Sequence, residues 1–254
     1  MTSAPQPVLY VHGLHKSYRG RTAVDRVDLS IAPGERVALI GPNGAGKTTT
    51  LMSCLGMIEP DAGTVELLGS RTRRARRAAL ARVGYTAGQL PLPPHLRVAE
   101  YLALFGRLYG AADPGEQALA GLRRFGIEHL ARRMGAELSS GQRTLVGIVK
   151  ATMHAPALLV LDEPTSSLDP EVARRARRGL LELCGAGDAA LLITSHNMAE
   201  VEQLAQRAIF LLGGRVVLDG GIDEIAVQFG HRTLEDTYLY LSDSQPQSAP
   251  SRGA

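Results

Sequence analysis

The stretch from Gly41 to Thr48 carries the most specific chemistry in this sequence. It reads Gly41-Pro42-Asn43-Gly44-Ala45-Gly46-Lys47-Thr48 and fits the pattern G-x-x-x-x-G-K-[ST], between an apolar run and a helix-like segment. Glycines let successive backbone N–H groups turn toward an anion, and a helix start adds partial positive charge. Lys47 would reach the β- and γ-phosphates of a nucleotide, and the Thr48 hydroxyl would bind Mg²⁺. The stretch therefore predicts a phosphate-binding loop.

Two adjacent carboxylates form a second candidate for chemistry. The continuous apolar run 157–161 predicts a parallel strand buried on both faces, and it ends in Asp162 and Glu163. The carboxyl ends of such strands are where α/β sheets bind ligands. Because neighbouring strand residues point to opposite sides, we expect one carboxylate to serve the metal and the other to serve water. The run 189–194 ends in Ser195-His196, which predicts His196 at the same sheet edge.

Three further features each allow two interpretations. Tyr18, in the first turn, is either an exposed hairpin aromatic or a stacking platform for a purine ring, and its spacing does not decide. The segment 138–142 opens a helix, so its serines either cap that helix or form a second anion-binding helix terminus. The run Arg71–Arg77 holds five arginines. A solvated helix face is favoured there over a site for anionic lipid headgroups.

Composition limits the class of protein. The 254 residues are 44% hydrophobic and 21% charged, which is ordinary for a globular chain with a core. No apolar run approaches the ~18 residues of a membrane span, and the first residues lack a secretory pattern. Cys54 and Cys184 have no metal or redox spacing, which favours free thiols in a reducing compartment. A net charge of +3 is too small to indicate nucleic acid.

Strand and helix patterns alternate along the chain, with one helical interruption. We expect β structure over residues 8–34, a short strand at 83–86, and a hairpin that turns at Gly213-Gly214. Helical spacing predicts about 50 residues of helix between the strands, including Ile127–Met134. Later helices are expected over 170–184, 197–207 and 234–241. The Ser/Pro/Gln-rich end, 242–254, is expected to be disordered.

The order of these motifs resembles one family, the ATP-binding cassette (ABC) ATPases, which are the nucleotide-binding subunits of ABC transporters. Leu138-Ser139-Ser140-Gly141-Gln142, between the phosphate loop and Asp162, looks like that family's signature, and the match covers about residues 8–241. The resemblance implies an α/β P-loop NTPase fold with a RecA-like parallel-sheet core, an antiparallel β subdomain and a helical subdomain. It implies one domain, 1–241, with 8–87 and 155–241 as the core, 88–154 as the helical subdomain, and 242–254 as a tail.

The resemblance also implies roles and cofactors, namely ATP and Mg²⁺. Glu163 matches the general base, His196 the switch histidine, and Thr48 and Asp162 the groups that hold Mg²⁺. Ser139 and Gly141 match groups that contact the γ-phosphate held by another subunit, which makes a head-to-tail dimer with two ATP molecules. The full nucleotide-binding set matched is Tyr18, Gly41, Pro42, Asn43, Gly44, Ala45, Gly46, Lys47, Thr48, Thr49, Ser139, Ser140, Gly141, Gln142 and Asp169.

Two positions depart from the family pattern. The glutamine that usually follows the strand at 83–86 would fall on Gly88, and Gln89 lies one residue later. We predict that Gln89 takes that catalytic and metal-contacting role through a shift of the loop. Leu145 stands where a basic residue often follows the signature, and no loss of function is expected from it.

The resemblance implies partners as well. These are a second copy or a homologous ATPase subunit, and integral membrane permease subunits that hold the chain at the cytoplasmic face of the membrane. The segment Thr233–Tyr238 resembles the tail of bacterial drug, antibiotic and lipid exporter subunits, and the part after His196 is short for an importer's regulatory domain. Export is therefore favoured. The alternatives are a soluble non-transport ABC ATPase of the assembly or repair type, and a nucleotide-dependent interaction protein without turnover; Asp162, Glu163 and His196 argue against the latter.

Overall fold

The predicted buried strands lie side by side in one sheet. The computed structural model describes residues 6–71, 73–87, 92–166, 168–185, 189–230 and 233–243. Within these ranges a six-stranded sheet has the order β5-β6-β7-β3-β8-β9, parallel from β5 to β8 and antiparallel between β8 and β9. Its strands are β3 (Arg36–Ile40), β5 (Val83–Ala87), β6 (Leu158–Asp162), β7 (Ala190–Ser195), β8 (Arg207–Leu212) and β9 (Arg215–Gly221).

The strands β3, β6, β7 and β8 are buried on both faces of this sheet, which is why they read as continuous apolar runs. In β3, Val37 and Leu39 belong to one apolar cluster, whereas Ala38 and Ile40 belong to the other. The first cluster continues into the antiparallel sheet, and the second continues into the helices. The sheet is thus the middle layer, and residues at its carboxyl edge lie between two separately packed cores.

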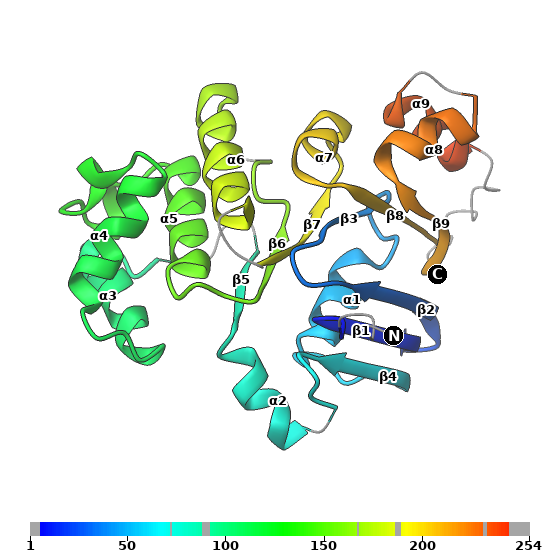
Figure 1. Ribbon diagram of the computed structural model, residues 1–254, viewed down its shortest axis with the longest axis horizontal. Coiled ribbons are helices and arrows are strands. Elements are labelled where there is room, and N and C mark those ends of the chain that lie inside the picture. The colour runs from blue at the N-terminus through cyan, green and yellow to red at the C-terminus, as the bar shows by residue number, and fades with distance from the viewer. Residues whose placement is uncertain are drawn as a thin grey trace, which may run out of the picture.

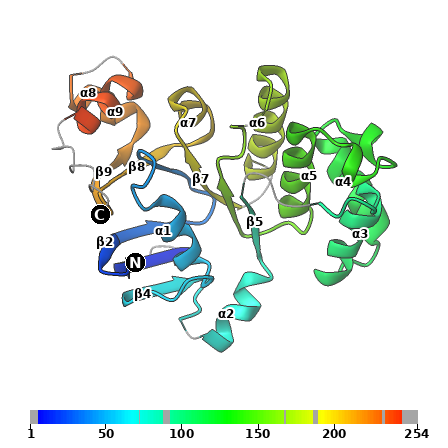
Figure 2. The same cartoon turned by 180° about the vertical axis from the view of Figure 1, so that it is seen from behind.

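A second, antiparallel sheet flanks the phosphate loop. It has the order β2-β1-β4, with β1 (Leu9–Tyr18), β2 (Arg21–Ile31) and β4 (Ala62–Leu67). Arg19 and Gly20 both have positive φ, 48° and 79°, as a two-residue hairpin turn between Tyr18 and Arg21 requires. Helix α1 (Lys47–Cys54) packs beside this sheet, as both views show (Figures 1 and 2).

The helical interruption forms a group at one end of the molecule (Figure 1, green). It contains α3 (Val98–Leu108), α4 (Pro114–Arg124) and α5 (Ser140–Thr152), all between β5 and β6 in the chain. The boundaries of a helical subdomain at 88–154 stay a prediction. The other helices are α2 (Arg73–Leu80), α6 (Pro170–Gly185), α7 (Met198–Leu204), α8 (Ile222–Gln228) and α9 (Leu234–Asp243).

Some local predictions were wrong. The segment Ile127–Met134 is no α-helix, because only Glu128–Leu130 and the later Gly135–Glu137 form short 3-10 turns. Gly126 turns the chain with φ +66°, and the backbone near Met134 pairs with that near Arg97 instead. Helix α7 ends at Leu204 because β8 begins soon after it, and α8 was not anticipated. Helix α9 runs past residue 241 to Asp243, whereas 244–254 lie outside the described ranges.

Candidate functional site

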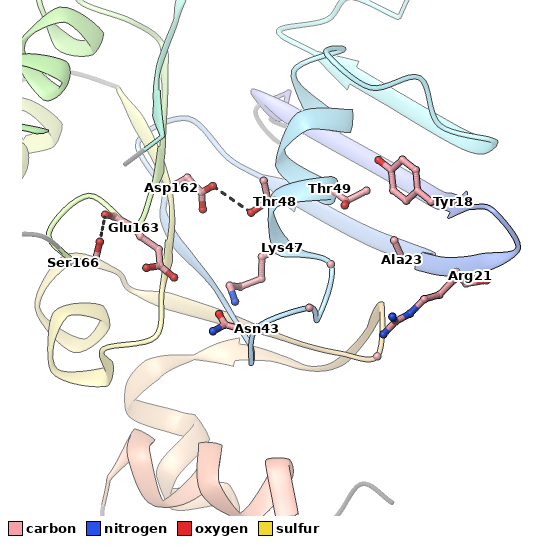
Figure 3. Close-up of a pocket in the computed structure, with 14 residues that line it drawn as sticks. Tyr18, Arg21, Ala23, Asn43, Lys47, Thr48, Thr49, Asp162, Glu163 and Ser166 are labelled. Atoms are coloured by element: carbon pink, nitrogen blue, oxygen red, sulfur yellow. Dashed lines mark hydrogen bonds between the residues drawn. The ribbon is translucent and has the colours of Figure 1, made fainter. Parts of the chain in front are cut away.

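A cavity of about 740 Å³ opens between the two sheets at the phosphate loop. It brings together residues from β1, β2, α1, β6 and the β8–β9 turn. Figure 3 shows Asp162, Glu163 and Ser166 at one end, Tyr18 and Arg21 at the other, and the phosphate loop between them. The lining residues are Tyr18, Arg21, Thr22, Ala23, Asn43, Gly44, Gly46, Lys47, Thr48, Thr49, Asp162, Glu163, Ser166 and Gly213.

The shape of the phosphate loop depends on its glycines. Gly44 and Gly46 have φ values of +81° and +102°, which L side chains rarely adopt. A Cβ on Gly46 would lie 2.3 Å from the carbonyl oxygen of Ala23, so the loop and β2 could not keep their approach. Gly46 precedes α1, whose first-turn N–H groups have no acceptor within the helix. The loop is therefore built to receive an anion.

Lys47 is held inside this loop. Its side chain is 8% exposed, and its Nζ donates to the carbonyl oxygens of Gly41 at 2.6 Å and Pro42 at 3.1 Å. Burial lowers the pKa of the Lys47 ammonium, while the negative charges of Glu163 and Asp162 oppose that change. The ammonium is thus pre-positioned beside the cavity at little further cost in side-chain entropy.

Thr48 and Asp162 supply oxygen donors next to the loop. The Thr48 hydroxyl donates to Asp162 Oδ2 at 3.3 Å, and the Thr194 hydroxyl donates to the other carboxylate oxygen, Oδ1. In the described part of the chain no group of three or more His, Cys, Asp or Glu could hold a metal alone. One hydroxyl and one carboxylate beside a phosphate site suit Mg²⁺, which usually keeps waters and binds substrate phosphates.

Glu163 follows β6 in a strained turn. Its φ is +50°, unusual for a non-glycine residue, and its N–H donates to both the carbonyl and the hydroxyl oxygen of Thr194, each at 3.1 Å. The Glu163 Oε1 lies 3.1 Å from His196 Nδ1. Asp162 and Glu163 reach different partners, whereas the assignment of one to metal and the other to water stays a prediction. The cause is this turn rather than strand alternation, because β6 ends at Asp162.

Tyr18 lies at the far end of the cavity, at the end of β1. Its ring is 44% exposed, and Lys16 Nζ lies 5.6 Å from the ring centroid. An exposed aromatic in the lining of a phosphate-binding cavity is consistent with a stacking platform for a base. That role stays a prediction.

The segment 138–142 does cap a helix. Ser139 Oγ accepts from the Gln142 N–H at 3.2 Å, and Gln142 Oε1 accepts from the Ser139 N–H at 3.0 Å, which is a capping box for α5. Ser139 and Ser140 are exposed, and residues 138–142 are absent from the cavity lining given above. Asp169, exposed just before α6, is also outside it. Gln89, like Gly88, lies outside the described residues.

Sequence reasoning missed several residues that the fold brings to the site. Arg21, Gly213 and Ser166 line the cavity, and Thr194 contacts both Asp162 and Glu163. Thr194 had a usable signal, because it ends a predicted buried strand just before Ser195-His196. In the parallel pair β6–β7 it stands directly opposite Asp162.

The parallel sheet, the phosphate loop after β3 and the two carboxylates at the carboxyl end of β6 define a phosphate-loop ATPase. Residues 24–166 match a family model described as ABC transporter. The chain belongs to this family as an ATP-binding subunit that hydrolyses ATP with Mg²⁺.

Named relatives agree on the family but differ in direction of transport. The chain is 37% identical over 234 residues to the Nod factor export ATP-binding protein I of Paraburkholderia xenovorans, covering 91% of this chain and 77% of that protein. It is 38% identical over 229 residues to the phosphonates import ATP-binding protein PhnC of Alcaligenes faecalis, covering 84% and 83%. A solved ATP-binding subunit of an ABC transporter superposes with a TM-score of 0.85 at 30% identity, covering 92% of this chain and 99% of that one.

Proposed function

We propose that this subunit hydrolyses ATP in a head-to-tail dimer and thereby drives export of a substrate through separate membrane subunits. One observation supports the dimer most directly. The signature residues Ser139 and Ser140 are exposed and ordered by the α5 cap, yet they do not line the cavity of their own chain. An ordered, exposed helix N-terminus fits a role in completing the phosphate site of another copy.

In this proposal the chain's own groups divide the work of hydrolysis. Lys47 and the loop amides hold the phosphates in place, and Thr48 and Asp162 hold Mg²⁺, which when bound neutralises phosphate charge. Glu163 orients a water and accepts its proton at the carboxylate. His196, at 3.1 Å, keeps that carboxylate aimed at the γ-phosphate. Asp169 serves the contact between subunits, and Tyr18 stacks on adenine.

The Ser139 hydroxyl can still donate a hydrogen bond to a group on the partner copy. Its oxygen already accepts from the Gln142 N–H, so its proton remains available to donate outward. A donor and a helix N-terminus at one point favour a phosphate oxygen as acceptor. The partner copy would therefore supply the part of the γ-phosphate site that a single chain lacks.

The dimer is tested with Glu163→Gln, which keeps the side-chain shape but removes the base. Gel filtration with ATP and Mg²⁺ should show a stable dimer with little hydrolysis. Adding Ser139→Asp should return the protein to a monomer, because aspartate still caps α5 but places a negative charge against the partner's phosphate. Ser139→Asn, a neutral cap, is the matched control and should still dimerise. Normal turnover by a monomeric Glu163→Gln protein would refute the assignment.

Export is supported by the tail-like segment Thr233–Tyr238 and by the similarity to a Nod factor export protein. Import is the second candidate, because a phosphonates import protein is equally similar. Among the described helices, none has both the length and the hydrophobicity to cross a bilayer. The path would therefore belong to permease subunits that hold this chain at the cytoplasmic face. In inside-out vesicles carrying the full complex, ATP-driven substrate uptake would support export, and ATP-driven release would support import.

A further inference from the structure

Glu200 is a buried carboxylate for which the hydrolysis proposed above has no use. It lies on α7 and is 2% exposed. Burying a carboxylate is costly unless strong donors satisfy its oxygens. Here each oxygen of the Glu200 carboxylate accepts from one hydroxyl. The Thr165 hydroxyl donates to Oε1 at 2.5 Å, and the Ser195 hydroxyl donates to Oε2 at 2.6 Å.

These two hydroxyls come from the two segments that carry the reacting pair. Thr165 follows Glu163 closely in the loop after β6, and Ser195 is the last residue of β7, immediately before His196. One carboxylate therefore joins the loop of Glu163 to the loop of His196. Because the bonds are charge-assisted, they fix the distance between these loops more firmly than neutral bonds would.

The Ser195 end of this bridge is itself fixed. Asn197 N–H donates to Ser195 Oγ at 3.0 Å, and the Glu200 N–H donates to Asn197 Oδ1 at 3.2 Å. These two hydrogen bonds connect Ser195 and Asn197, the residues on either side of His196, to each other and to α7. His196 is exposed, so its position depends on the hydrogen bonds that fix the backbone beside it.

The Glu163 loop needs such support because of its backbone conformation. A non-glycine residue at φ +50° is held only where the surroundings determine it from more than one side. The Thr194 oxygens hold the Glu163 N–H on one side, and Glu200 holds Thr165 on the other. Without Glu200 the second restraint is lost.

Glu200 cannot act by touching nucleotide. It is not among the residues that line the 740 Å³ phosphate cavity, and it lines another cavity of about 320 Å³, which His196 also lines. We propose that Glu200 is a positioning residue for ATP hydrolysis, which keeps Glu163 and His196 in contact by fixing their two loops. This inference rests on the proposed roles of Glu163 and His196.

The first test is steady-state hydrolysis by Glu200→Gln. The amide keeps the shape of the side chain but can accept only at one oxygen, so one of the two hydroxyls loses its acceptor. We expect kcat to fall roughly 10- to 100-fold, as a misplaced base would cause, with affinity for a non-hydrolysable ATP analogue unchanged. Glu202→Gln, an exposed glutamate on the same helix, is the matched control and should hydrolyse normally. An unchanged kcat for Glu200→Gln overturns the proposal.

A double-mutant cycle separates positioning from general damage. In a His196→Ala background, Glu200→Gln should cost less than about twofold further, because the pair that it positions is already broken. Equal losses in both backgrounds overturn the proposal. Should Glu200→Gln fail to fold, Thr165→Val removes the hydroxyl that donates to Glu200 and should lower kcat in the same way. Thr165→Ser keeps that hydroxyl and should hydrolyse normally.

Amide hydrogen exchange without nucleotide tests the same bridge independently of catalysis. In Glu200→Gln, segments 163–166 and 195–197 should both exchange roughly tenfold faster, whereas Glu202→Gln should leave them unchanged. Unchanged exchange overturns the positioning role. The proposed roles of Glu163 and His196 are tested separately, because normal ATP turnover by Glu163→Gln and His196→Ala would refute those roles whatever Glu200→Gln does.

Discussion

Thr194 offers a prediction whose size follows from its contacts. Its side chain is fully buried, and its one hydroxyl both donates to Asp162 and accepts from the Glu163 N–H. Thr194→Val keeps the branched shape but removes this hydroxyl. The Glu163 N–H retains the Thr194 carbonyl at 3.1 Å, so only the carboxylate of Asp162 loses a partner.

Losing one hydrogen bond to a charged group costs about 1.5–3 kcal/mol of unfolding free energy. For a chain of this size, about 2 kcal/mol corresponds to a fall in Tm of roughly 4–8 °C. Hydrolysis should fall further than stability alone explains, because the Asp162 carboxylate, which is proposed to hold Mg²⁺, loses the hydroxyl that orients it. Thermal unfolding and phosphate release, measured on the same preparation, give the two values.

Two controls make the prediction decisive. Thr194→Ser keeps the hydroxyl and should restore both Tm and turnover. Thr152→Val removes another buried hydroxyl, one that donates only to the helix carbonyls of Ile148 and Val149, and should cost less than about 1 kcal/mol with turnover unchanged. If Thr194→Val and Thr152→Val behave alike in both measurements, Asp162 is held by something other than Thr194.

Two other predictions concern nucleotide affinity and alkaline stability. Lys47→Ala should weaken ATP binding roughly 30- to 100-fold in calorimetry, because a charge-assisted hydrogen bond to phosphate is lost. Lys150→Ala, on α5, is the control and should leave the affinity unchanged. Equal affinities of the two variants would contradict the role of Lys47. Burial raises the pKa of Cys54 from 9.0 to about 12, so the folded state keeps a proton that the unfolded state loses. Stability is therefore lost as pH rises above about 9, by at most ~1.4 kcal/mol per pH unit from this group. Urea unfolding at pH 8 and 10 should show a smaller decline in Cys54→Ala; an equal decline would exclude Cys54 as a cause.

Much of the fold could be predicted because it depends on local patterns. The run Val37–Ile40, the turn at Gly213-Gly214 and the phosphate loop each carry their signal within a few residues. The segment Ile127–Met134 shows the limit of this approach. Its apolar spacing suits a helix, but Gly126 and a pairing with the chain near Arg97 decide its conformation, and such a pairing between distant segments leaves no mark on spacing.

The candidate site was predicted in its residues more than in its arrangement. Asp162, Glu163 and His196 were found because each ends an apolar run. The left-handed turn at Glu163 and the restraints from Thr194 and Glu200 were not found, since they depend on which parallel strands become neighbours. Sequence order does not fix that neighbourhood. β6 and β7 lie adjacent, whereas β3, far earlier in the chain, pairs with β7 and β8.

The cavity draws its walls from both sheets, and this has a mechanical consequence. Tyr18 and Arg21 belong to the antiparallel sheet, whereas Asp162 belongs to the parallel one. At the phosphate loop the β8–β9 turn joins them, because the Gly214 N–H donates to the Ala45 carbonyl oxygen and the Gly214 carbonyl oxygen accepts from the Asp25 N–H. One apolar cluster continues from the parallel sheet into the antiparallel one and packs the two together. The distance between Tyr18 and Asp162 is therefore set by this packing before any nucleotide binds, and a nucleotide that spans the cavity would meet walls already in place.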